Sequence, residues 1–222
     1  MKKIIILLLF LSMGIFGQQK INRNRIADPN WSPPNGGLIL DGSTQFASIP
    51  DNANLDFGDG DFSIRAIVNI SSTEIGYILY KGTTTINYIL YSSGGILYAN
   101  IDDGVNSATA SVSVSLDTLY DIIIVYDRSG NLELYLNGSS VDSQDITSVG
   151  DIDNSSDFNI GARVLTLDRY FNGYIWDVDV VNHALTQAEI IKAWNNGQPW
   201  LAETEFKYQG ASQTSLDRKS VV

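Results

Sequence analysis

The chain has 222 residues, a formal net charge of −11 and no cysteine. Binding to phosphate groups needs clustered lysines and arginines, so this acidity argues against nucleic acid as a partner. Without cysteine, the fold has to be held together by apolar burial and backbone hydrogen bonds, and neither a disulfide nor a cysteine-linked lipid can contribute.

The first residues have the pattern of a secretory signal peptide. Lys2 and Lys3 precede an apolar run at 4–16, and Gly17 is followed by polar residues. A helix needs roughly 20 apolar residues to span a bilayer, and this run is shorter. We therefore expect residues 1–17 to be cleaved, the mature protein to be secreted or held at the cell surface, and no membrane insertion afterwards. An uncleaved membrane anchor is the alternative.

Residues 18–36 form a polar lead-in that is rich in turn residues, and segments of period 2 then follow one another with turn residues between them. Valine, isoleucine, tyrosine, phenylalanine and threonine are enriched in these segments, which predicts strands. The predicted strands cover 37–41, 45–49, 61–71, 76–81, 86–92, 96–102, 107–115, 119–127, 132–137, 140–144, 157–162 and 170–182.

One helix is predicted after the strands, at 186–197. Thr186 is suited to the N-cap, Glu189 completes a capping box three residues later, and Gly197 is a stop signal. Around twelve short strands with one helix predict an all-β fold. We expect a two-sheet antiparallel β-sandwich, or jelly roll, with one short C-terminal helix.

Three blocks of sequence support a closer assignment. They are LDGSTQFASIPDNANLDFGDGDFSIRAIVNI at 40–70, YDRSGNLELYLNGSSV at 126–141 and FNGYIWDVDVVNHALTQAEIIKAWNNG at 171–197. In this order they resemble the opening, the central hairpin and the closing strand and helix of a laminin-G-like domain of the concanavalin A-like lectin/glucanase superfamily. The resemblance places the domain at 37–197. It implies two curved sheets, with a concave face and loop rims that bind glycans or proteins.

The resemblance also implies a structural calcium site. In this superfamily the final strand often supplies an aspartate to the ion, and Asp177 matches that position. Asp41, Gly42 and Asp59 are the expected partners, because calcium takes six to eight oxygen ligands and a Gly-rich turn exposes its carbonyls.

The alternative for Asp177 is a carboxylate that faces solvent. Strict alternation puts Asp177 and Asp179 on one face of the last strand. The same alternation puts Trp176, Val178 and Val180 on the other face, so both carboxylates could point outward. The sequence leaves the two alternatives open.

No catalytic site is expected. A retaining glycosidase needs two carboxyl groups about 5–5.5 Å apart, which enzymes of this superfamily place in the motif E-x-D-x-x-E. No glutamate of this chain begins that motif. A nucleophilic mechanism is equally unsupported, because cysteine is absent and the single histidine, His183, lies in a turn before the helix.

Tyrosines gather in three neighbouring predicted strands, between residues 76 and 102. Sugar rings stack on aromatic faces, so we expect a ligand site here. Its expected residues are Tyr88, Tyr91, Tyr98, Asn87, Asn100 and Asp102. Tyr88 and Tyr91 differ in parity, so one of them faces the core. The alternative is that these tyrosines are ordinary sheet residues.

The tail is predicted to lie outside the domain. Residues 198–216 are expected to form a linker or the start of a following region, and 217–222 resemble translated sequencing-adapter DNA. We expect a secreted, non-catalytic module that binds carbohydrate or a surface protein, with calcium in a structural role. Two alternatives are a structural or adhesive spacer in a surface or phage appendage protein, and a glycoside hydrolase, which the missing carboxylate motif disfavours.

Overall fold

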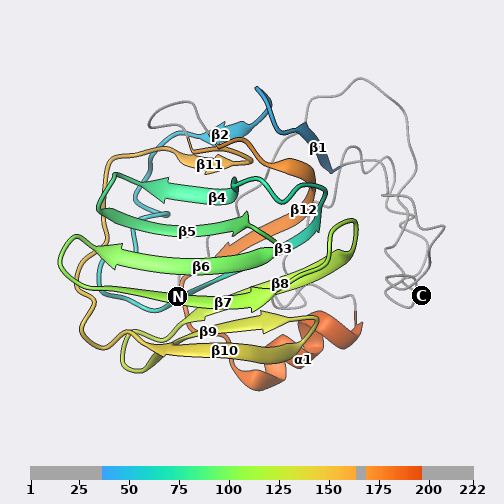
Figure 1. Ribbon diagram of the computed structural model, residues 1–222. Helices are drawn as coiled ribbons and strands as arrows, with labels where there is room; N and C mark the ends of the chain where they lie inside the picture. Colours follow the sequence, from blue (N-terminus) through green and yellow to red (C-terminus); the bar gives the residue numbers. More distant parts are fainter. Residues whose placement is uncertain (1–36, 164–168, 197–222) are drawn as a thin grey trace, which may run out of the picture.

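The computed structural model describes residues 37–163 and 169–196 (Figure 1). The predicted signal peptide, the lead-in, the helix stop at Gly197 and the two tail segments, 198–216 and 217–222, lie outside these ranges. Among the described residues, no helix has the length and apolar character needed to cross a membrane.

Twelve antiparallel strands form two sheets of six strands each. The first sheet contains, in spatial order, β1 (Leu38–Asp41), β12 (Asn172–Val181), β3 (Phe62–Ile70), β8 (Leu119–Tyr126), β9 (Asn131–Leu136) and β10 (Ser139–Asp145). The second sheet contains β2 (Ala47–Ile49), β11 (Phe158–Ile160), β4 (Gly76–Gly82), β5 (Ile86–Ser93), β6 (Ile96–Asp103) and β7 (Ser107–Ser113). Figure 1 shows β4 to β7 side by side in one layer, with β3 and β12 in the layer behind. The predicted two-sheet sandwich is confirmed.

The core lies between the two sheets and is filled by alternate residues of each strand. Aromatic rings occupy one part of it. The Phe62 ring stacks on Tyr126 at 4.1 Å and on Phe57 at 4.3 Å between ring centroids. Tyr88 reaches the same group from the second sheet, with its ring tilted and 5.1 Å from that of Phe62. These contacts join strands of both sheets, so they hold the layers together.

Helix α1 (Gln187–Asn196) packs on the outer face of the first sheet. Its start is the predicted capping box: the Glu189 carboxylate accepts a 2.8 Å hydrogen bond from the Thr186 amide, and Thr186 Oγ1 accepts one of 3.3 Å from the Glu189 amide. Ile190 and Ala193 are buried against a cluster on β8, β9 and β12 that includes Tyr135. One outer face of the sandwich is therefore partly covered.

A β-bulge interrupts β12, and it corrects the strict alternation expected there. Trp176 pairs with Ile67 and Asp179 pairs with Arg65, so β12 has one residue more than β3 over this stretch. Asp177 lies in the bulge with a φ of 44°. As a result Val178 is in the core, whereas Trp176 packs in a separate cluster with Ile67 outside it. The expectation that Trp176 and Val178 share a face was wrong.

A buried ion pair lies beside this bulge. Arg65 Nε donates to Asp121 Oδ1 at 2.9 Å and Arg65 Nη2 donates to Asp121 Oδ2 at 2.7 Å, and each side chain is only 1% exposed. Asp179 Oδ2 lies 3.8 Å from Arg65 Nη1. Burial opposes the charged form of Arg65, but the nearby carboxylates, chiefly Asp121, outweigh it and raise the pKa of Arg65 above its ordinary value.

Removing the Asp121 carboxylate should destabilise the domain strongly. The change Asp121→Ala leaves a buried guanidinium without its bidentate partner, and breaking such a pair costs about 3–5 kcal/mol. Urea unfolding followed by tryptophan fluorescence measures the loss of unfolding free energy. The matched control is the double change Arg65→Met with Asp121→Leu, which removes both charges and should restore most of that loss. Equal losses in the single and double variants would contradict this account.

Candidate functional site

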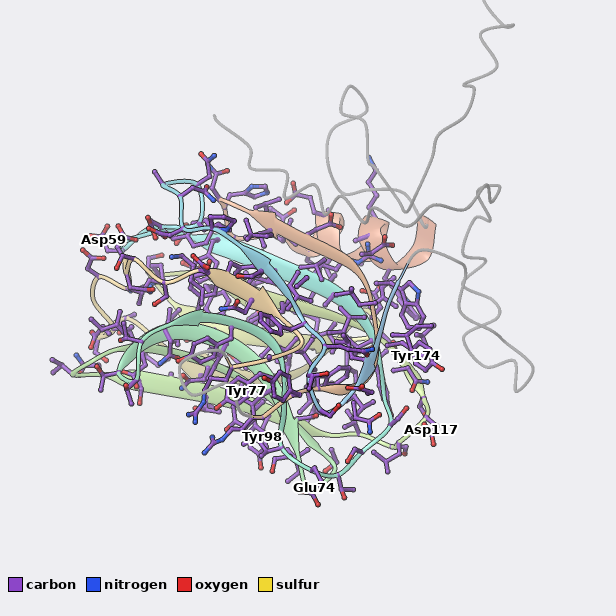
Figure 2. All side chains as sticks on the ribbon, turned by 90° about the horizontal axis from the view of Figure 1, so that it is seen from above. Asp59, Glu74, Tyr77, Tyr98, Asp117 and Tyr174 are labelled. Atoms are coloured by element: carbon purple, nitrogen blue, oxygen red, sulfur yellow. The ribbon has the colours of Figure 1, made fainter. Side chains whose placement is uncertain are left out.

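Three stacked tyrosines lie on the outer face of the second sheet. Tyr77, Tyr91 and Tyr98 come from β4, β5 and β6, and the strand register places Tyr91 directly opposite both of the others. The rings of Tyr77 and Tyr91 are 5.2 Å apart at 22°, and those of Tyr91 and Tyr98 are 4.8 Å apart at 13°. Figure 2 shows Tyr77 and Tyr98 close together on one side of the sandwich. We call these three residues the tyrosine row.

The stacking decides what the tyrosine row can offer to a ligand. The facing surfaces of the three rings cover one another, and the guanidinium carbon of Arg163 lies 5.8 Å from the Tyr77 ring centroid. At the opposite end, the cross-strand partner of Tyr98 is Ser111 on β7, which has a small side chain. Tyr98 is only half-buried. The row thus offers one flat ring face, at Tyr98, together with ring edges and hydroxyl groups.

Polar side chains lie beside the tyrosine row on the same face. Asn100 Nδ2 donates to Thr109 Oγ1 on β7 at 2.9 Å. Asp102 Oδ1 accepts a 2.7 Å hydrogen bond from the Gly104 amide. Asn87 is only 6% exposed, and its Oδ1 has no hydrogen-bond partner among the described residues. An aromatic ring face bordered by amide and carboxylate groups has the composition of a polar-ligand site.

The structure places five of the six predicted ligand residues on one outer face: Tyr91, Tyr98, Asn87, Asn100 and Asp102. Asn100 is the next outward residue after Tyr98, whereas Asn87 and Asp102 pair with each other four residues, or about 13 Å, along the strands from the tyrosine row. Tyr88 is the exception. It lies in the core, where its hydroxyl donates to the Leu55 carbonyl at 3.0 Å and burial raises the pKa of its phenol. The reason is parity: residues 88 and 91 are an odd number of positions apart on one strand, so they face opposite ways.

Two arginines lie at the β4 end of the tyrosine row, and the sequence pattern did not predict their position there. Arg169 Nη1 donates to the Tyr77 hydroxyl at 3.4 Å, and Arg163 lies over the Tyr77 ring. Burial, followed by Tyr77 and Tyr98, raises the pKa of Tyr91, whereas Arg169 acts in the opposite direction. Arg163 follows β11 and Arg169 precedes β12, and no local pattern in the sequence places either of them beside Tyr77.

The four predicted calcium ligands are not brought together. Asp41 pairs with Asn172 in the register of β1 and β12, so Asp177 lies five residues, or about 16 Å, further along the strand. Asp59 precedes β3, whose opposite end at Ile70 pairs with Gly173. Asp59 is therefore at the far end of the first sheet from Asp41 and Gly42, as its position opposite Tyr174 in Figure 2 illustrates.

The surroundings of these residues agree with that separation. The Asp41 carboxylate accepts hydrogen bonds from the Ser43 amide and hydroxyl, both 2.8 Å, and these bonds lower the pKa of Asp41. Across residues 37–163 and 169–196, no group of three or more histidine, aspartate or glutamate side chains is arranged to hold a metal ion. The residues Asp177, Asp41, Gly42 and Asp59 therefore do not fit the calcium site that the resemblance implied.

Comparison with known proteins was made for both sequence and structure. A laminin G family model, described as the concanavalin A-like lectin/glucanases superfamily, matches residues 41–191. None of the curated proteins compared with the chain matches it in sequence.

Several solved structures have the same fold. The binding domain of botulinum neurotoxin serotype G has a TM-score of 0.60 and 16% identity, over 70% of this chain and 41% of that chain. The serotype D ligand binding domain, in complex with N-acetylneuraminic acid, has a TM-score of 0.62 and 15% identity, over 72% and 42%. The binding domain of Paraclostridial Mosquitocidal Protein 1 has a TM-score of 0.58 and 17% identity, over 72% and 46%. The chain spans less than half the length of these structures, and at such identities the likeness shows the fold alone.

Asp103 lies at the end of β6, and the hydrogen bonds that its carboxylate accepts predict that it stabilises the fold in a pH-dependent way. Its carboxylate accepts hydrogen bonds from the amides of Asn106 at 2.6 Å, Val105 at 2.7 Å and Gly150. These bonds, with that of Asn106 the largest, lower the pKa of Asp103 to about 2. Because the folded-state pKa is below the unfolded one, the carboxylate stabilises the fold above pH ~4, and this contribution is lost as the pH falls towards ~2.

We therefore expect Asp103→Asn to be less stable than the unchanged protein at pH 6, with a difference that shrinks steadily below pH ~4. Urea unfolding at pH 6, 4, 3 and 2.5 measures the difference in unfolding free energy. A difference that stays constant over this range would show that the charge of Asp103 does not contribute in this way.

Proposed function

The chain belongs to the concanavalin A-like lectin/glucanases superfamily, and on that premise we propose that it is a carbohydrate-binding module whose ligand lies on the outer face of the second sheet. One observation carries the proposal: the tyrosine row ends in a half-buried ring, Tyr98, that has a serine as its outer neighbour and amide side chains beside it. The module is secreted, as the pattern of residues 1–17 suggests.

The chemistry of a sugar suits this face. The apolar C–H surface of a pyranose packs against an aromatic ring, because both surfaces lose water on contact. The hydroxyl groups around the ring edge then need donors and acceptors. Asn100 lies two residues after Tyr98 on β6, and Thr109 is its cross-strand partner on β7. Their side chains supply an amide and a hydroxyl group. A sugar that stacks on Tyr98 would thus lie above β7.

We further propose that the preferred ligands are acidic oligosaccharides that extend from Tyr98 along the ring edges of the tyrosine row to its β4 end. Arg163 and Arg169 border the far end of the tyrosine row in a chain whose net charge is −11, so this is a local region of positive charge on an acidic protein. A guanidinium binds a carboxylate or sulfate through paired hydrogen bonds. The structural likeness to a binding domain solved with N-acetylneuraminic acid is consistent with this choice, although that ligand belongs to the other protein.

The module is proposed to bind its ligand without converting it. Glu133, on β9 in the first sheet, accepts a short hydrogen bond from the Tyr135 hydroxyl and lies in the other layer from the tyrosine row. Asp102 lies on the same face of β6, four residues from Tyr98, and its Oδ1 is already bound by a backbone amide. A retaining mechanism would need a second carboxyl group about 5–5.5 Å away on the same face.

The variant Tyr98→Ala tests the site. We expect it to bind sugars about tenfold more weakly, which corresponds to about 1.4 kcal/mol of lost stacking. The matched control is Tyr174→Ala, because Tyr174 is also half-buried and stacked, on Trp176 at 5.5 Å, but lies on the first sheet. Binding is measured on a glycan array and then by calorimetry with each sugar that is captured.

Three outcomes would contradict the proposal. Silence of the unchanged protein across neutral and acidic glycans would favour a structural or adhesive spacer. Equal losses in Tyr98→Ala and Tyr174→Ala would move the site away from the tyrosine row. Cleavage of a captured glycan would show that the protein is an enzyme.

The variant Arg169→Gln tests the preference for acidic sugars separately. It should weaken the binding of sialylated or sulfated glycans and leave neutral glycans unaffected, and the effect should diminish as the salt concentration rises. Equal effects on neutral and acidic glycans would show that Arg169 positions Tyr77 and does not contact the ligand.

A further inference from the structure

A buried lysine lies at the end of the sandwich where two long connections meet. Lys81, on β4, pairs with Tyr88 and Phe158 of the neighbouring strands, and its side chain is completely buried. Its ammonium is surrounded by four oxygens: Asp51 Oδ1 and the Asn154 carbonyl at 2.8 Å, the Ser156 carbonyl at 2.9 Å and Asp56 Oδ1 at 3.1 Å. We call Asp51, Asp56, Asn154 and Ser156 the lysine cage.

The oxygens of the lysine cage are those that a hard cation takes. Two carboxylates and two backbone carbonyls converge on one point, which is the mixture that proteins offer to calcium. The distances differ from that case: 2.8–3.1 Å is the length of an N–H···O hydrogen bond, whereas calcium lies about 2.3–2.6 Å from its ligands. An ammonium has three donors, so one of the four oxygens interacts with Lys81 through charge alone. Asp56 Oδ1 is that oxygen, since it is buried and has no hydrogen bond among the described residues.

The cage joins two connections that are far apart in sequence. Asp51 and Asp56 belong to the segment between β2 and β3, and Asn154 and Ser156 belong to the segment between β10 and β11. Two further hydrogen bonds connect the same two segments. The Gly58 amide donates to Asp153 Oδ1 at 2.6 Å, and the Ile152 amide donates to the Gly58 carbonyl at 3.2 Å.

Negative charge exceeds positive charge at this junction. Burial chiefly, with the neighbouring carboxylates Asp151 and Asp56, raises the pKa of Asp153, whereas the hydrogen bond from the Gly58 amide and the charge of Lys81 lower it. The ammonium therefore keeps these two segments together against the repulsion of their carboxylates.

We propose that Lys81 is a built-in structural cation, which occupies the position of a metal ion and makes this end of the domain independent of calcium. The proposal stands apart from the predicted calcium ligands Asp41, Asp59 and Asp177, none of which belongs to the lysine cage. It does not depend on sugar binding, since Lys81 points into the sandwich and the tyrosine row lies on the outer face.

The experiment compares melting temperatures in chelator and in 5 mM calcium chloride, a calcium concentration about 5–50 times a typical extracellular-site Kd. The unchanged protein should melt at the same temperature, within about 1 °C, in both. The variant Lys81→Ala removes the cation and leaves room for an ion, so it should melt well below the unchanged protein in chelator and gain about 2–9 °C in calcium. The variant Lys81→Met removes the charge but fills the space, so it should be destabilised and should not respond to calcium.

Lys192→Ala is the matched control for the loss of one lysine. Lys192 is half-buried on α1, away from the cage, and its removal should leave both melting temperatures close to those of the unchanged protein. If Lys81→Ala does not fold in chelator, we expect the addition of calcium to refold it, and tryptophan fluorescence measures this refolding.

Four results would overturn the proposal. The unchanged protein could gain as much from calcium as Lys81→Ala. Lys81→Met could be as stable as the unchanged protein, which would show that the charge contributes nothing. Lys81→Ala could fail to respond to calcium, either by melting or by refolding. Lys192→Ala could reproduce the calcium response of Lys81→Ala.

Discussion

The need to bury one row of side chains per strand between two sheets determines where every functional group of this domain lies. Successive side chains of a strand point to opposite faces, so each residue that enters the core sends its neighbours outward. In β5, Tyr88 and Leu90 fill the core, and this leaves Asn87, Ile89 and Tyr91 on the outer face. The tyrosine row follows from the packing of the core beneath it, because the antiparallel register aligns one outward tyrosine on each of three strands.

The two outer faces of the sandwich have different roles. On the first sheet nearly every residue of β3 and β8 is buried. Helix α1 packs against part of β8, Trp176 packs against Ile67 and Leu119, and Arg65 pairs with Asp121. On the second sheet, β6 alternates between buried and half-buried residues over most of its length, and in β7 only Ala110 is buried. An accessible aromatic face is therefore present on the second sheet near β7, and this difference favours the second sheet as the ligand face.

Local patterns predicted much of this arrangement, and long-range contacts determined the rest. Alternation and turn residues indicated the strands, and Thr186 and Glu189 indicated the start of α1. Tyr91 and Tyr98 were expected together in neighbouring strands, and they are cross-strand partners. The bulge at Asp177 was missed because strict alternation assumes that no strand contains an extra residue. The extra residue shows only in the pairing of β12 with β3. Arg163 was missed for a similar reason, since its neighbour Tyr77 is 86 positions earlier in the chain.

Buried cations explain how so acidic a chain can keep carboxylates inside its fold. Unpaired buried charges are strongly unfavourable, and Asp121 and Asp56 are both compensated by a basic side chain, Arg65 in one case and Lys81 in the other. A tethered cation differs from a bound ion in one respect: its local concentration is fixed by the chain, so it cannot dissociate on dilution or be removed by a chelator. A module exposed to varying calcium would keep this end of its fold, and with it the strand β4 that carries Tyr77, one member of the tyrosine row.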